Sequence, residues 1–284
     1  MKPESLELSG ISGPIAALDY GDPGFPPVLA LHGWLDNAAS FEPLSAHLKN
    51  YRLIALDFAG HGFSGHRPPG TKYHLVDYVA DVAHALKDLE LEKVRLMGHS
   101  LGAGVSILFA AVYPEVVEKL VLIDGVGPIT ESTVGASERL RNAIDAGLKH
   151  ALEPSLSPRT YSQWQTLIEA RTKASPISNR SAELLVRRNA SEQGKDIILH
   201  SDRRLRHPSP VYFTEDAVLH FVEQVACPTL VVLAKEGMVM HRDQTKARLS
   251  AFRNVTVIEC EGQHHLHMDQ PQQIALRIDK FLAD

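Results

Sequence analysis

The chain has 284 residues, of which 44% are hydrophobic and 22% are charged, and its formal net charge at pH 7 is −5. This composition is typical of a soluble globular protein with a sizeable core. A net negative charge without a basic block argues against nucleic acid or an anionic membrane surface as a partner. Residues 1–5 lack the apolar core of a signal peptide, and no apolar run approaches the ~20 residues that span a bilayer. We therefore expect a cytoplasmic protein that acts on a small molecule; the composition does not indicate its oligomeric state.

Short apolar runs alternate with amphipathic segments along the first half of the chain. Residues 5–20 predict an antiparallel hairpin at a sheet edge, because two strand-like runs flank a Gly/Ser turn. A run typical of a strand covered on both faces follows at residues 28–31, further buried strands are expected at 51–56 and 94–97, and another strand at 117–123. Helical patterns lie between or after these runs, at residues 40–49, 75–89 and 105–113.

The alternation stops between residues 127 and 210 and then resumes. The interrupted segment is polar and mainly helical by pattern, which predicts a helical cap inserted after the sixth strand rather than a separate domain. Beyond it, helices are expected at 214–224, 242–251 and 270–282, and strands at 229–233 and 255–259. The sequence thus predicts an α/β fold, a mostly parallel doubly wound sheet, with its core formed by residues 1–126 and 211–284.

The two cysteines are expected to stay reduced. Cys227 precedes one of the predicted strands, while Cys260 comes at the end of the next. If these strands are parallel neighbours, the thiols lie at opposite ends of the sheet, too far apart to form a disulfide.

The pattern Gly98-x-Ser100-x-Gly102 stands between a predicted strand and a predicted helix. A serine on such a tight turn takes strained backbone angles, and glycines two residues away on either side avoid collisions there. The serine hydroxyl then projects above a helix N-terminus, whose free N–H groups favour developing negative charge. This context predicts that Ser100 is a nucleophile.

Four motifs together resemble the α/β-hydrolase family. They are His32-Gly33-Trp34, the turn from Asp57 to Ser64, the elbow Gly98–Gly102 and His264-x-x-His267-x-x-x-Pro271, in the order and spacing of that family. The stretches Leu31–Asn37 and Asp57–Gly62, with Asp202-x-Arg204-Leu205, are similar to the serine hydrolase-like proteins. The resemblance covers nearly the whole chain.

The resemblance implies a general base on the loop after the last strand. His264 lies seven residues before Pro271, the spacing that the family gives its base, and we favour it over His265 and His267. His267 is expected to brace the loop, and His265 to face away. The backbone N–H groups of Trp34 and Leu101 are the expected oxyanion hole.

The acid that should orient the base departs from the family pattern. The family places an aspartate after the strand 229–233, but Gly237 occupies that position. Asp124, which ends the strand 117–123, is the favoured substitute, since the ends of neighbouring parallel strands share one rim. Glu236, one residue early, is an alternative, and so is a chain with no acid at all.

These residues indicate a carboxylesterase-like serine hydrolase that works through an acyl-enzyme. The same machinery also cleaves thioesters or carbon–carbon bonds, while a weakly active ligand-binding protein on this scaffold is the alternative that the glycine at position 237 suggests. No cofactor is expected. No metal is expected either, because His32, Asp57, His61 and His99 show no metal-binding rhythm and are interpreted as bracing loops.

Overall fold

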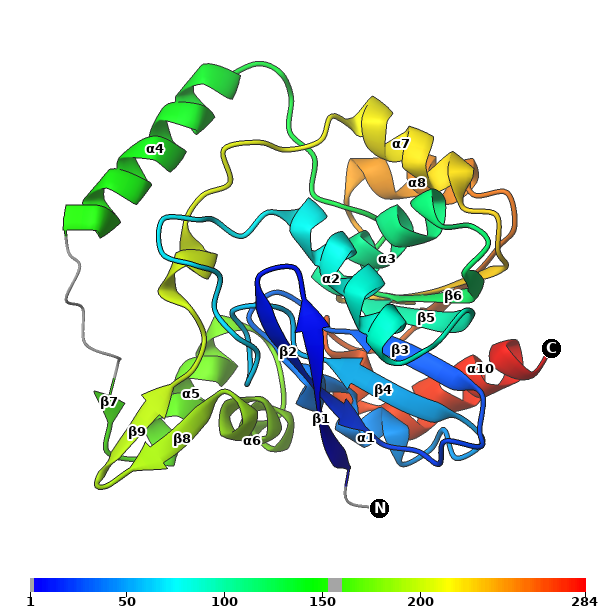
Figure 1. Ribbon diagram of the computed structural model, residues 1–284. Coiled ribbons are helices and arrows are strands. Elements are labelled where there is room, and N and C mark those ends of the chain that lie inside the picture. The colour runs from blue at the N-terminus through cyan, green and yellow to red at the C-terminus, as the bar shows by residue number, and fades with distance from the viewer. Residues whose placement is uncertain (1–2, 153–159) are drawn as a thin grey trace.

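A computed structural model describes residues 3–152 and 160–284 of the chain and is built around one mixed sheet (Figure 1). The strand order across the sheet is β1-β2-β4-β3-β5-β6-β10-β11. All neighbours from β4 to β11 pair in parallel, while β1 pairs with β2 and β2 with β4 in the antiparallel sense. The strands are β1 Glu4–Gly10, β2 Gly13–Asp19, β3 Pro27–Leu31, β4 Arg52–Leu56, β5 Val94–His99, β6 Val117–Ile123, β10 Thr229–Ala234 and β11 Val255–Cys260.

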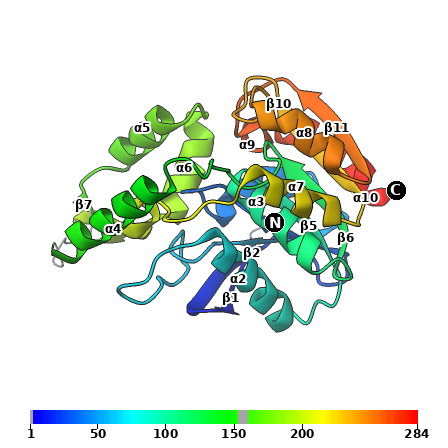
Figure 2. The same ribbon diagram turned by 90° about the horizontal axis from the view of Figure 1, so that it is seen from above.

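Helices cover both faces of this sheet, because successive side chains of each central strand are buried on opposite sides. In β3, Leu29 and Leu31 pack with the layer of α2, α3, α7 and α8, whereas Val28 and Ala30 pack with the layer of α1 and α10 (Figures 1 and 2). The helices of the core are α1 Glu42–Ser45, α2 Leu75–Asp88, α3 Leu101–Val112, α7 Glu215–Gln224, α8 Asp243–Ala251, α9 Leu266–Asp269 and α10 Pro271–Ala283. The predicted α/β fold with a mostly parallel sheet is confirmed.

The helix predicted over residues 40–49 is wrong in extent. A 3-10 turn, η1 (Ala38–Phe41), capped by the side chain of Asn37, leads into the single turn α1. Pro43 stands in the first turn of α1, where it has no N–H to donate to a preceding carbonyl. A new helix therefore begins at Glu42 instead of continuing the preceding turn.

In the part that the structure describes, the segment between β6 and α7 holds three α-helices and a small second sheet. Figures 1 and 2 show these elements gathered on one side of the core. The antiparallel sheet, of order β7-β9-β8, was not predicted, because its strands are too short to show an alternating pattern. The elements are α4 Ala136–Leu152, β7 Thr160–Tyr161, α5 Trp164–Ala174, α6 Asn179–Arg188, β8 Ala190–Gln193, β9 Asp196–Leu199 and the 3-10 turn η2 Arg203–Arg206.

Two smaller expectations can be compared with the structure. Cys227 and Cys260 are both buried and free, and the register pairs Ala234 with Cys260 at one end of β10 while Cys227 precedes the other end. Among the described residues, no helix is long and apolar enough to cross a membrane.

The central strands should carry much of the stability. Leu122 of β6 is fully buried, whereas Leu276 of α10 is 69% exposed. We expect Leu122→Ala to lower the free energy of unfolding by about 2–5 kcal/mol, since it removes buried methyl groups and leaves a cavity. Leu276→Ala, the matched control, should change it by less than about 0.5 kcal/mol. Urea unfolding checks both values, and equal effects would contradict the assigned core.

Candidate active site

Ser100 lies on a strained turn between β5 and α3. Its backbone angles are φ 51° and ψ −111°, a region that residues with side chains rarely adopt. A Cβ atom at position 98 would lie 2.5 Å from Ser106 Oγ, and one at position 102 would overlap the carbonyl oxygen of Leu31. Glycine on both sides of Ser100 is therefore a steric requirement of this turn.

The two expected oxyanion donors lie at the start of α3 and on the loop after β3. Leu101 is the first residue of α3, so its N–H has no acceptor within the helix. Trp34 follows β3, and the N–H of Gly102 donates to the carbonyl of His32 at 3.0 Å. This bond holds the loop that carries Trp34 against the first turn of α3.

Asp124 and His264 form a buried pair beside this turn. Nδ1 of His264 donates to Oδ2 of Asp124 at 2.5 Å, and the carboxylate is fully buried. Two further backbone N–H groups also donate to Asp124, that of Ala234 at the end of β10 at 3.2 Å and that of Met238 in the following loop at 3.1 Å. Because Nδ1 carries the proton, Nε2 of His264 is left as the acceptor.

Gly237 has a specific role beside this pair. A Cβ atom at position 237 would lie 2.5 Å from both carboxylate oxygens of Asp124. The carboxylate that comes from the end of β6 thus fills the space that a side chain at position 237 would need. Glu236, in contrast, is exposed and accepts a hydrogen bond from the side chain of Gln263.

The other two histidines of the base loop are both buried. His267 is bonded through Nε2 to the hydroxyl of Ser40 at 2.7 Å, which agrees with a bracing role. The expectation that His265 faces away is wrong: its side chain points inward, and Nε2 donates to Asp36 at 3.1 Å. The sequence offered no partner for His265, because Asp36 is more than 200 positions away.

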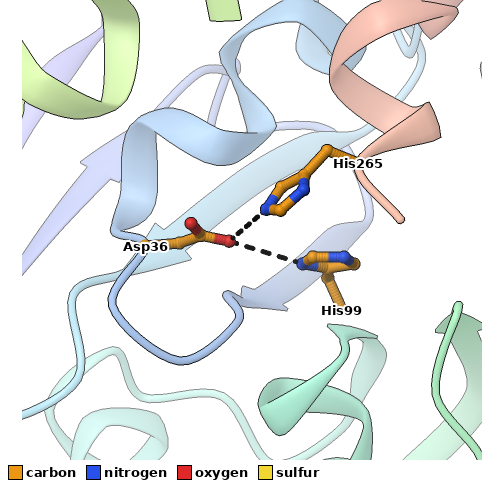
Figure 3. A group of neighbouring side chains, drawn as sticks. All are labelled: Asp36, His99 and His265. Atoms are coloured by element: carbon orange, nitrogen blue, oxygen red, sulfur yellow. Dashed lines mark hydrogen bonds and ion pairs between the residues drawn. The ribbon is translucent and has the colours of Figure 1, made fainter. Parts of the chain in front are cut away.

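Asp36, His99 and His265 form a buried cluster whose ligand-type atoms lie within 4.8 Å of one another (Figure 3). Spacing along the chain could not reveal it, since the end of β5 and the loops after β3 and β11 each contribute one residue. Burial alone would raise the pKa of Asp36, but His265 and the guanidinium of Arg171 help to hold it well below its usual value. Arg171 lies 2.5 Å from Oδ1 of Asp36 and balances its charge, so we interpret the cluster as an ion pair that fastens α5 to the loops after β3 and β11.

Further contacts fasten the segment between β6 and α7, referred to as the cap, to the loops around the elbow. The indole N–H of Trp34 donates to the carbonyl of Leu205 at 3.1 Å, and the side-chain amide of Asn37 donates to that of Leu185 at 2.8 Å. Arg188 of α6 lies 2.9 Å from the carboxylate of Asp57. The cap is thus held directly against the loop that positions Trp34.

The remaining polar residues of the motifs brace these loops, as expected. Nε2 of His32 accepts from the N–H of Phe58 at 2.9 Å, and Asp57 accepts from those of Ala38 and Phe63. Burial lowers the pKa of His32 to about 4 and that of His61 to about 3, so both rings are neutral at pH 7.

Comparisons with known proteins agree with this architecture. The model of the alpha/beta hydrolase fold matches residues 26–271. The chain belongs to the α/β-hydrolase fold family. A serine hydrolase-like protein of Danio rerio is 32% identical over 90% of this chain and 81% of its own length, and serine hydrolase-like protein 2 of Homo sapiens is 31% identical over 98% and 93%. The crystal structure of the hypothetical protein PA1622 from Pseudomonas aeruginosa PAO1 is 38% identical, with a TM-score of 0.91 over 99% of this chain and 100% of that one.

These similarities confirm the resemblance on which the motifs were interpreted. Membership of this α/β-hydrolase family makes hydrolase chemistry the expected class of reaction for the α/β scaffold.

The complementarity of Gly237 and Asp124 can be tested by stability alone. We expect Gly237→Ala to cost about 1–3 kcal/mol by overpacking. In an Asp124→Ala background the same change should cost at least ~1 kcal/mol less, because the carboxylate is gone. Gly24→Ala, whose Cβ would meet no atom closer than 3.3 Å, is the control. Additive effects in urea unfolding would show that the two positions do not compete for space.

Proposed function

We propose that the protein is a serine hydrolase that cleaves carboxylic esters through an acyl-enzyme, with Ser100 as nucleophile, His264 as general base and Asp124 as the acid. The observation that carries the proposal is the buried 2.5 Å hydrogen bond between His264 and Asp124, beside a serine on a strained strand-to-helix turn. A buried carboxylate on Nδ1 fixes the tautomer in which Nε2 can accept a proton, and it stabilises the imidazolium that forms.

The chemical steps follow from these positions. The Ser100 oxygen attacks the ester carbonyl carbon while its proton moves to Nε2 of His264, and the carbonyl oxygen becomes an oxyanion held by the N–H groups of Trp34 and Leu101. The carbon–oxygen bond to the alcohol then breaks, and the alcohol leaves with the proton from His264. Water, deprotonated by His264, attacks the acyl-enzyme; the bond to Ser100 breaks, the serine regains its proton and the carboxylic acid is released.

Exposed apolar side chains on the loops that carry these groups support an ester with an apolar acyl or alcohol part. Trp34 is 52% exposed, Met238 55% and Ile129 60%. Trp34 carries a proposed oxyanion donor, the N–H of Met238 binds Asp124, and Ile129 follows Asp124 by five residues. Burying such exposed side chains against a hydrocarbon group would contribute to substrate binding.

The same observations support two alternative functions to different degrees. Thioester or carbon–carbon bond hydrolysis would use the same three residues and differs only in the bond presented to Ser100. A ligand-binding protein without efficient turnover is less well supported, since its motivation was the lack of an acid at position 237, and Asp124 offers a carboxylate to the same histidine. The cytoplasmic location stays a prediction.

Serine-dependent turnover is the direct test of the nucleophile. We expect wild-type protein to hydrolyse p-nitrophenyl esters, with butyryl and octanoyl esters preferred to acetyl, and Ser100→Ala to lose at least ~10⁴-fold in kcat/KM. Ser106→Ala is the matched control, because Ser106 lies on α3, the helix that follows Ser100, and its hydroxyl donates to the carbonyl of Gly102. The proposal is wrong if Ser100→Ala still hydrolyses these esters, or if the wild type hydrolyses none of them at any acyl-chain length.

The acid is tested by two carboxylate-to-amide changes. Asp124→Asn should lower kcat by up to about four orders of magnitude, the loss known for the same change in a serine protease triad, because an amide favours the wrong tautomer of the histidine. Glu236→Gln, at an exposed side chain bonded to Gln263, should stay within about threefold of wild type. Steady-state kinetics at constant pH decides between them, and the reverse pattern would reassign the acid to Glu236.

A further inference from the structure

His99 is fully buried and stands where three parts of the candidate site meet. It directly precedes Ser100 in the chain, and its Nε2 donates to the backbone carbonyl of His264 at 2.9 Å. The ring of His99 lies 4.6 Å, centroid to centroid, from the ring of His264. The side chain of His99 therefore links the end of β5, directly before the nucleophile, to the loop that carries the base.

The opposite edge of the His99 ring limits how closely the loop with Gly33 and Trp34 can approach the elbow. A Cβ atom at position 33 would lie 2.9 Å from Nδ1 of His99, so the backbone of Gly33 packs directly on this ring. The next residue, Trp34, provides the proposed oxyanion N–H. The ring thus acts as a spacer that sets how far this loop lies from the elbow.

The protonation of His99 is determined by its surroundings. Burial lowers its pKa to about 4, so the ring is neutral at pH 7 and carries one proton. A carbonyl oxygen can only accept, so that proton is on Nε2. Nδ1 faces Oδ2 of Asp36 at 3.6 Å and has no hydrogen-bond partner among the described residues. An unsatisfied buried nitrogen is costly, which indicates that the ring is retained for its contacts with His264 and Gly33.

We propose that His99 is a positioning residue, which fixes His264 and the Gly33-Trp34 backbone relative to Ser100. The inference rests on the proposed function of Ser100 and His264. A hydrophobic side chain could fill the space, but it could not bond the carbonyl of His264. Displacing a catalytic group by ~1 Å can cost ~10²-fold in rate, so a single donor in this position has a measurable effect.

The test compares variants that keep or remove the donor. His99→Leu removes it, while His99→Gln places an amide N–H near the position of Nε2. His61→Leu is the matched control, because His61 is equally buried and binds a backbone carbonyl, that of Ala59, on a different loop. The readouts are kcat and KM for a p-nitrophenyl ester, the rate at which a fluorophosphonate labels Ser100, and the melting temperature.

We expect His99→Leu to lower kcat and the labelling rate ~100-fold with KM within about threefold, and His99→Gln to recover at least ~10-fold of the loss. His61→Leu should lower the melting temperature comparably but keep kcat within about threefold. If His99→Leu does not fold, His99→Phe, which keeps a ring without a donor, takes its place. Equal rates in the donor-less and Gln variants, or an equal loss in His61→Leu, would overturn the inference. A wild-type protein that is not labelled would instead overturn the proposed function itself.

Discussion

The hydrogen bond between Asp124 and His264 is the interaction on which the candidate site depends. It joins the end of β6 to the loop after β11, across the intervening strand β10, whose last residue and following loop each contribute one N–H group to the same carboxylate. A buried carboxylate is stable only when its oxygens are bonded, and here three donors share the two oxygens. Three parallel strands, β6, β10 and β11, therefore have to end in register before the base can be oriented.

Backbone strain is concentrated around the same bond. Four non-glycine residues among those described have positive φ, and three of them lie in the loops of the candidate site: Leu35, Ser100 and Asp124. Such conformations cost of order 1–3 kcal/mol each and persist only where surrounding contacts impose them. The sheet and the two buried helical layers supply that support, while the cap adds bonds to the loop after β3 through Arg171, Asn37 and Trp34.

The core was predictable because the hydrophobic periodicities of strands and helices can be recognised in a single sequence. Runs such as 28–31 and 120–123 are apolar on both faces, and the Gly-x-Ser-x-Gly pattern marks a turn whose sterics leave few alternatives. The small cap sheet left no periodic pattern. The inward position of His265 and the cluster around Asp36 depend on contacts between loops far apart in the chain, which spacing does not encode. Gly237 was only partly predictable. The sequence alone shows that it departs from the family pattern, but the steric reason, the carboxylate of Asp124 beside it, is evident only in the structure.

The most direct test of the account is a proton NMR spectrum of the wild type and two variants, recorded for the strongly deshielded proton of a histidine Nδ1–H bonded to a carboxylate. The account predicts this low-field signal in the wild type and in Glu236→Gln, with assignment to His264, and its absence from folded Asp124→Asn, where an amide replaces the charged acceptor. A signal that persists in Asp124→Asn and disappears in Glu236→Gln would show that His264 is oriented by a different carboxylate.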